Sequence, residues 1–191
     1  MNSFSSTLRT ATHRSRIAAI ITLTCLALVT GCGTNDSSDA TPSVTPQNVS
    51  AVDGVRLEGA LGAPQALTLD ALRGFASRSQ QVSFDSSAGR QTHSYDGPLL
   101  LDVLNTAQPK ADPAAKNGLL RLAIVVTGAD GYSATLAWAE IAPEFAGQQV
   151  LLALSEDGRP LARPRLTTPG DRKGGRYISE VVRIRVVDAA R

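Results

Sequence analysis

Alternating apolar and polar residues indicate a strand, a turn and a second strand over residues 82–95. Val82 and Phe84 alternate with polar neighbours, which is the period of a half-buried strand. A turn at residues 88–89 follows, and the alternation resumes over residues 91–95. Polar side chains therefore gather where the first strand ends, and the pattern favours a functional site there.

A helix is expected directly after this unit. Gly97 is expected to end the strand, and Pro98 suits the first helical position because the N–H that proline lacks is not needed there. The helix would have a broad apolar side, formed by Leu99, Leu100, Leu101, Val103 and Leu104.

The remaining pattern from residue 51 onward predicts mostly strands. Strands are expected at residues 55–59, 119–127, 132–136, 150–154, 165–168 and 177–187, and short helices at residues 69–75 and 137–141. Thr68 is expected to cap the first of these helices. Turns at residues 128–131 and 157–158 are typical of hairpins. Regular strand–helix alternation is lacking, so the expected fold class is α+β, mostly β, with a mixed sheet and a few short helices.

The first 31 residues are typical of a lipoprotein signal peptide. A basic region at residues 9–16 precedes the apolar run of residues 17–28, which is too short to span a membrane comfortably. The run ends in Leu28-Val29-Thr30-Gly31-Cys32, which resembles a bacterial lipobox. Cys32 is therefore the predicted lipidation site, where several acyl chains would anchor the protein stably. An ordinary secretory signal with a chance cysteine is the alternative.

The mature chain is expected to consist of a tether and one domain. Residues 32–50 are rich in Thr, Ser, Asn, Asp and Pro, which predicts a flexible tether. Residues 51–191 have the size of a single domain. The predicted location is the cell envelope, with the domain lipid-anchored and facing the periplasm or the cell exterior.

Cysteine content and charge narrow the function classes. The two cysteines are Cys25, inside the predicted signal peptide, and Cys32. The domain itself therefore has no thiol, cannot form a disulfide, and cannot bind zinc or an iron–sulfur cluster through thiolates. The formal net charge is +2, and no basic block has interleaved aromatic residues, so nucleic-acid binding is not expected.

The central stretch resembles the molybdopterin-binding domain of the sulfite oxidase-type oxidoreductases. That family has a strand with a cysteine near its end, a glycine-containing turn, a second strand and a "W/Y-x-G-x-x-L-x-x-L-L" helix start. The last of these motifs reads here Tyr95, Gly97, Leu100, Val103 and Leu104. The short helix around residues 67–72 and the segments 169–170 and 175–178 resemble the family in the same order. The resemblance extends from Val55 to Val187 and implies the family's fold.

Three departures from the family pattern concern positions that face the cofactor. The cysteine whose thiolate ligates molybdenum in the family falls here at Ser86, and a serine oxygen is a harder ligand that stays protonated unless a metal acidifies it. Residues 159–164 replace the family's "H-G-x-P" segment, and Ser179 replaces its closing lysine. The departures favour a binding or accessory module with no bound metal and no cofactor; molybdopterin is suggested by the resemblance alone. The alternative is an active molybdopterin-dependent oxidoreductase in which Ser86 or solvent replaces the thiolate.

Five residues are candidates for contact with a cofactor or ligand: Ser86, His93, Arg172, Lys173 and Arg176. For His93, Asp85 across the hairpin is a candidate partner, although an exposed histidine on a polar strand face is the simpler interpretation. The three cations lie among flexible glycines and are suited to a phosphate or another small anion, unless they form only a solvated loop. Besides the membrane, the expected partners are a small anionic ligand or another envelope protein.

Overall fold

The structure, a computed structural model, describes residues 54–190. These residues belong to one compact unit. The predicted signal peptide, the lipidation site Cys32 and the predicted tether lie outside the described residues. No helix within residues 54–190 is long and apolar enough to cross a membrane.

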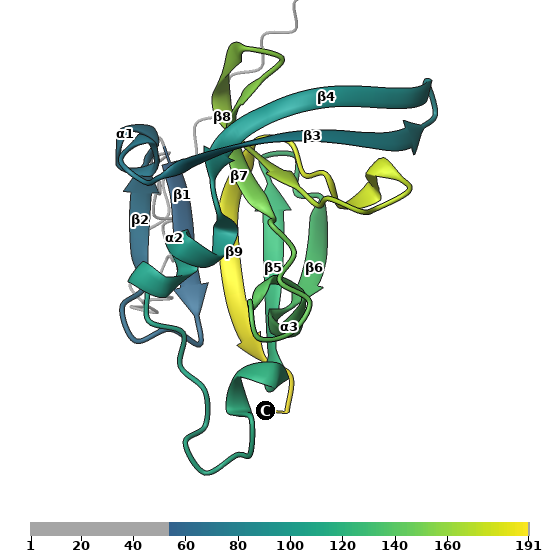
Figure 1. The fold of residues 1–191 in the computed structure, drawn as a ribbon. Coiled ribbons are helices and arrows are strands. Elements are labelled where there is room, and N and C mark those ends of the chain that lie inside the picture. Colours follow the sequence, from purple (N-terminus) through teal and green to yellow (C-terminus); the bar gives the residue numbers. More distant parts are fainter. Residues whose placement is uncertain (1–53, 191) are drawn as a thin grey trace, which may run out of the picture. The chain divides into compact units, whose positions relative to one another are not determined.

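Within residues 54–190, nine strands form two sheets, which confirms the mostly β prediction (Figure 1). The five-stranded sheet has the order β2-β1-β9-β5-β6. Its strands are β1 (Gly54–Gly59), β2 (Gln65–Thr68), β5 (Leu122–Gly128), β6 (Ser133–Ala137) and β9 (Val181–Asp188). The first and last strands, β1 and β9, run parallel and every other pair is antiparallel, so this sheet is mixed.

The four-stranded sheet is antiparallel throughout and has the order β3-β4-β7-β8. Its strands are β3 (Ser77–Ser86), β4 (Gly89–Pro98), β7 (Leu151–Glu156) and β8 (Arg159–Thr167). Both predicted hairpin turns in this sheet form, one between β3 and β4 and one at residues 157–158 between β7 and β8. The β3–β4 hairpin is longer than the alternating pattern indicated, because its pairing continues from Ser86–Gly89 at the turn to Ser77–Pro98.

The described residues also form three short α-helices and two 3₁₀ turns: α1 (Leu69–Arg73), α2 (Leu100–Thr106), α3 (Trp138–Ile141), η1 (Gly118–Arg121) and η2 (Gly174–Arg176). Thr68 caps α1 as predicted, since its hydroxyl accepts the backbone N–H of Ala71 at 3.1 Å.

The predicted helix start at Pro98 is wrong by two residues. Gly97 and Pro98 remain in β4, paired with Arg78 and Ser77, and α2 begins at Leu100. A side chain at position 97 would collide with the carbonyl oxygen of Leu152 in β7. The glycine thus permits the close approach of two strands instead of ending one.

Several other boundaries also differ from the prediction: β8 begins at Arg159 instead of residue 165, and β2 was not predicted as a strand. Residues 119–121 form the 3₁₀ turn η1, so β5 begins only at Leu122. The final strand begins at Val181 instead of residue 177, because η2 and a positive φ of 50° at Glu180 interrupt extended backbone there.

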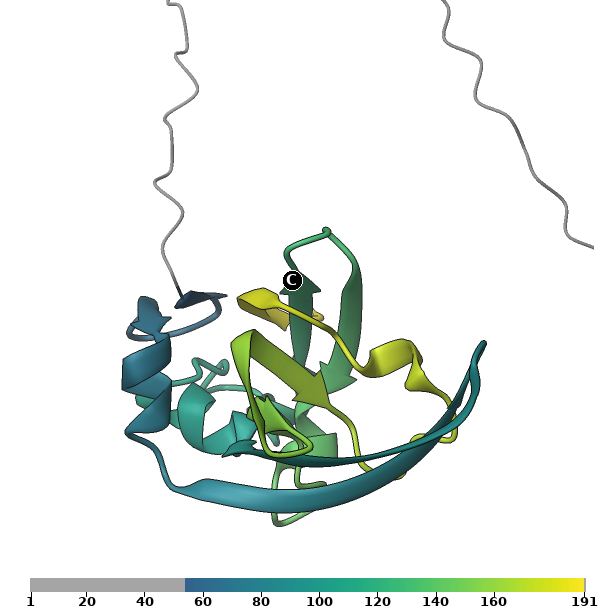
Figure 2. The ribbon, with the colours of Figure 1, turned by 90° about the horizontal axis from the view of Figure 1, so that it is seen from above.

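The larger core lies between the five-stranded sheet, helices α1 to α3 and β7 and β8, and includes the fully buried Val55, Leu72, Leu104, Ile124 and Leu152. A smaller core of Val82, Phe84, Tyr95, Leu151 and Ala153 belongs to the second sheet. Viewed from above, the β3–β4 hairpin curves outward and its far end lies beside the segment that contains η2 (Figure 2). The second core therefore fixes the hairpin against that segment.

Candidate functional site

Ser86 is the last residue of β3, and its hydroxyl is used by the hairpin turn. The oxygen accepts the backbone N–H of Ala88 at 3.1 Å, and the hydroxyl donates to the carbonyl of Gly89 at 3.0 Å. Serine commonly stabilises turns through such local hydrogen bonds. Ser86 is exposed and lines none of the cavities described below. Its side chain therefore stabilises the turn.

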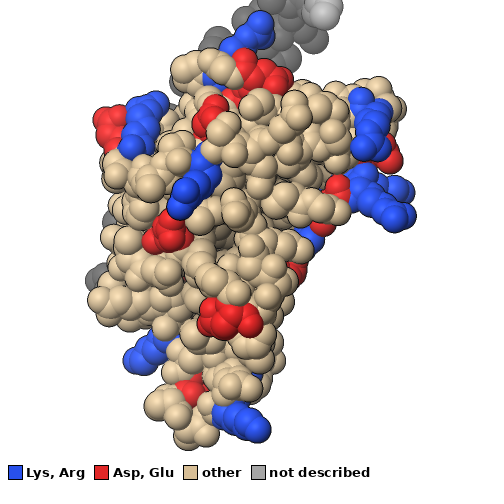
Figure 3. All heavy atoms as spheres, in the orientation of Figure 1, with Lys and Arg blue, Asp and Glu red and all other residues tan. Residues whose placement is uncertain are grey.

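The hairpin is joined to the segment between β8 and β9 by main-chain contacts. The N–H of Asp85 donates to the carbonyl of Arg172 at 2.8 Å, and Asp85 pairs with Lys173 as a parallel bridge. A groove of about 280 Å³ lies at this junction. It is lined by Ser83, Asp85, Arg90, Gly170, Asp171 and Arg172. Figure 3 shows basic side chains gathered around the hairpin end and the segment below it.

The three predicted anion-binding cations have different surroundings. Arg176 is fully engaged: its guanidinium donates to both carboxylate oxygens of Asp171, at 2.8 and 2.7 Å, and to Glu140 at 2.7 Å. This pairing holds the pKa of Asp171 below its usual value and raises that of Arg176. Arg176 therefore anchors the segment and has no free fork for a ligand.

Arg172 and Lys173 are exposed, and neither forms an ion pair with another residue of the described chain. Of the two, Arg172 lines the groove. Arg90, on the opposite side, lies 3.7 Å from Asp85, a distance at which an exposed pair is weak. Arg172 and Lys173, in or next to the groove, are thus free to contact an anion.

His93 does not have the partner that the sequence suggested. Its strand neighbour in β3 is Val82, and Asp85 pairs with Arg90. Two carboxylates from the β7–β8 hairpin approach it instead: Asp157 lies 2.8 Å and Glu156 3.3 Å from its Nδ1 atom. The histidine side chain is only 24% exposed, so the simpler interpretation of an exposed histidine is wrong.

A polar network continues from these carboxylates into the domain. The hydroxyl of the fully buried Tyr95 donates to Glu156 at 2.9 Å, and Arg165 lies 3.2 Å from the same carboxylate oxygen. Arg165 also donates to Ser179 at 2.7 Å. Burial raises the pKa of Tyr95 to about 12, with Arg165 lowering and Glu156 raising it to smaller extents. Ser179 thus accepts a hydrogen bond from this arginine and helps to hold it in place.

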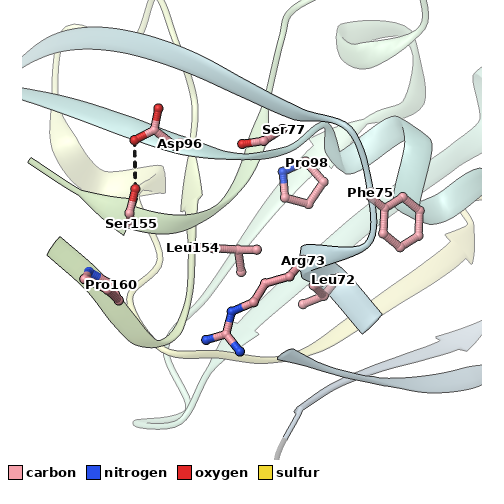
Figure 4. A pocket seen from close by; sticks show the side chains of 9 residues that line it. All are labelled: Leu72, Arg73, Phe75, Ser77, Asp96, Pro98, Leu154, Ser155 and Pro160. Atoms are coloured by element: carbon pink, nitrogen blue, oxygen red, sulfur yellow. Dashed lines mark hydrogen bonds between the residues drawn. The ribbon is translucent and has the colours of Figure 1, made fainter. Parts of the chain in front are cut away.

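Another cavity, of about 270 Å³, lies where α1 meets β4 and β7 (Figure 4). Leu72, Phe75, Pro98 and Leu154 supply apolar lining. Three of its four polar side chains already have partners: Ser155 donates to Asp96 at 2.8 Å, and Arg73 pairs with Asp70 at 2.6 Å. A larger cavity of about 510 Å³ lies at the opposite end, beside Lys110 and Arg185. Neither cavity is lined by any of the predicted site residues.

The residues present do not fit a molybdenum centre held by protein sulfur. Residues 54–190 contain no cysteine and no methionine, so this part of the chain lacks any sulfur donor. The only side chain at the expected ligand position, Ser86, has both its hydrogen bonds inside the turn.

Comparison with known proteins supports the predicted fold at a distance. No family model matches the chain, and no curated protein matches it. Among solved structures, it is similar to the sulfane dehydrogenase SoxCD from Paracoccus pantotrophus, with 18% sequence identity and a TM-score of 0.58. The match covers 71% of this chain but only 38% of that chain. The likeness supports a distant sulfite oxidase-like fold.

Proposed function

We propose that this chain is a lipid-anchored envelope protein whose sulfite oxidase-like domain binds a small anion without a molybdenum centre held by protein sulfur. The domain would act as a binding or accessory module outside the cytoplasmic membrane. The observation that carries the proposal is the state of Ser86, whose hydroxyl is committed to the turn in a domain that retains the fold. Membrane attachment rests on the lipobox-like sequence that ends at Cys32.

The groove beside the hairpin favours a small anion as the ligand. Its volume of about 280 Å³ lies just below the range typical of drug-sized ligands. Arg172 and Lys173 are free, and an arginine fork is suited to the paired oxygens of sulfate or phosphate. Asp85 and Asp171 line the same groove, but Asp171 is neutralised by Arg176. The groove therefore favours a compact ligand of low charge over an extended polyanion.

Titration with inorganic sulfate and phosphate tests this proposal. We expect saturable binding by the full chain that weakens at least about tenfold in the double variant Arg172→Gln/Lys173→Gln, since each charge-assisted bond contributes about 1.5–3 kcal/mol. The matched control, Arg56→Gln/Lys116→Gln, removes the same charge from exposed positions that do not line the groove. Equal weakening in both variants would indicate non-specific attraction and contradict the proposal.

An active oxidoreductase is the second candidate, because the fold neighbour is a dehydrogenase and the groove lies next to the strand that ends at Ser86. In that case Ser86 would have to leave the turn to ligate a metal. A visible absorption band from a reducible centre that Ser86→Ala abolishes would support this candidate. If the protein is purified from a cofactor-producing host and shows no such band, the oxidoreductase candidate is excluded.

A further inference from the structure

Three metal-ligating side chains converge on one point outside the anion groove. The Nδ1 atom of His93 and one carboxylate oxygen each from Glu156 and Asp157 lie within 4.8 Å of one another. His93 is in β4, whereas Glu156 ends β7 and Asp157 begins the turn to β8. The long-range pairing of β4 with β7 therefore creates this cluster, and Tyr95 is the strand partner of Glu156.

The spacing suits a divalent transition metal ion. Zinc binds nitrogen and carboxylate ligands at about 2.0–2.2 Å, which in a tetrahedral site separates the ligand atoms by roughly 3.4 Å. The distance from Nδ1 to Glu156 is already 3.3 Å, and that to Asp157 is 2.8 Å. The Asp157 oxygen needs to move away from Nδ1 by roughly 0.6 Å. It has room to do so, because its side chain is 52% exposed in a turn.

Surrounding contacts hold the ligands in these orientations. The His93 ring lies between the rings of Phe84 and Tyr95, at centroid distances of 6.1 and 5.9 Å. The Tyr95 hydroxyl fixes Glu156, and the backbone N–H of Ser94 donates to Asp157 Oδ1 at 2.9 Å. Such outer contacts orient metal ligands in proteins and raise their affinity.

One proton on the Nδ1 atom of His93 cannot fully satisfy both neighbouring carboxylates. A neutral imidazole can donate just one hydrogen from Nδ1, yet two carboxylates face that atom. A metal ion would accept an electron pair from all three groups at once. One imidazole with two carboxylates is a borderline-hard donor set that suits Zn²⁺ and Co²⁺ and needs no thiolate.

We propose that His93, Glu156 and Asp157 form a binding site for a Zn²⁺-like divalent cation, with the remaining coordination position open to water. The site is separate from the groove at Arg172, and its occupancy does not depend on the proposed anion binding. An ion there would join the β4 strand to the β7–β8 hairpin.

Two arginines oppose a cation at this site. Arg165 lies 3.2 Å from Glu156, and Arg159 acts on Asp157 through charge. Each positive charge weakens cation binding, more strongly at shorter distance. Removing Arg165 should therefore tighten binding, the reverse of the effect of removing a ligand.

The test measures Zn²⁺ binding by calorimetry on the untagged full chain near neutral pH. We expect one ion per chain in the wild type, at least about 100-fold weaker binding in His93→Gln and in Glu156→Gln, and tighter binding in Arg165→Gln. The control Asp70→Asn changes an exposed carboxylate on α1, outside both the cluster and the anion groove, and should bind like the wild type. Circular dichroism verifies that each variant is folded.

Co²⁺ provides a second readout that distinguishes this site from the cysteines and histidine in the N-terminal region. Binding at His93 predicts visible bands without a thiolate charge-transfer band, and these are lost in His93→Gln. Absence of binding in the wild type would overturn the proposal. It would also be overturned by binding that is unchanged in folded His93→Gln, or by a thiolate band.

Discussion

Arg176 and Asp171 form a bidentate ion pair that closes the segment between β8 and β9 next to the hairpin end, with donor–acceptor distances of 2.8 and 2.7 Å. Thr168 donates to the same carboxylate at 3.0 Å, and Glu140 accepts a hydrogen bond from the remaining arginine nitrogen. The arginine that the sequence assigned to a ligand thus holds the groove wall in place. Its neighbours Arg172 and Lys173 are left to face solvent.

Replacing Asp171 with Asn should destabilise the domain by about 1–3 kcal/mol, because the half-buried Arg176 loses the bidentate one of its two charged partners and keeps only Glu140. The folded-state pKa of Asp171 is lowered, so its stabilisation is present above the unfolded pKa near 3.8 and is lost as pH falls through the folded value. Urea unfolding at several acidic pH values measures both effects.

Asp70→Asn serves as the control for that experiment. Asp70 also pairs with an arginine, but its side chain is 90% exposed, so the cost should stay below about 1 kcal/mol. Equal losses of stability in the two variants would contradict the anchoring function of Asp171.

Gly174→Ala should destabilise the junction between hairpin and segment by about 1–3 kcal/mol. A methyl group at this position would lie 2.8 Å from two ring atoms of Phe84, which is itself packed against Tyr177 at a centroid distance of 4.3 Å. Gly175→Ala is the matched control, since nothing lies within 4 Å of the added carbon. Thermal unfolding should separate the two variants, and a neutral Gly174→Ala would show that the hairpin does not pack here.

Stability should decrease at alkaline pH because of buried tyrosines. Burial raises the pKa of Tyr95 and of Tyr177 to about 12, whereas an unfolded tyrosine ionises near 10. Because the pKa is higher in the folded state, each tyrosine makes its full contribution to the unfolding free energy below pH 10. This contribution is lost between about pH 10 and 12. The loss from Tyr95 alone would be at most about 3 kcal/mol, at 1.36 kcal/mol per pKa unit.

Comparison with Tyr95→Phe isolates that contribution. The variant cannot ionise at position 95, so its unfolding free energy should fall less steeply over the same alkaline range. Identical slopes for the variant and the wild type would show that Tyr95 is not the titrating group.

Local sequence predicted the elements better than the pairings between them. The alternation around Val82 and Phe84 placed the hairpin, and Asp157-Gly158 placed a turn, because periodicity and turn chemistry act over a few residues. The parallel pairing of β1 with β9 and the contact of His93 with Asp157 join distant parts of the chain. No local pattern encodes such pairings. The contact of Arg176 with Glu140 was missed for the same reason, since Glu140 comes from α3, 36 residues away.

The central claim, a sulfite oxidase-like domain without a molybdenum centre held by protein sulfur, is tested most directly by molybdenum and pterin analysis. The full chain is purified from a host that makes the cofactor, and both components are quantified per chain. We expect molybdenum and pterin far below stoichiometric amounts, with no change in Ser86→Ala. One molybdenum per chain, lost in Ser86→Ala, would contradict it.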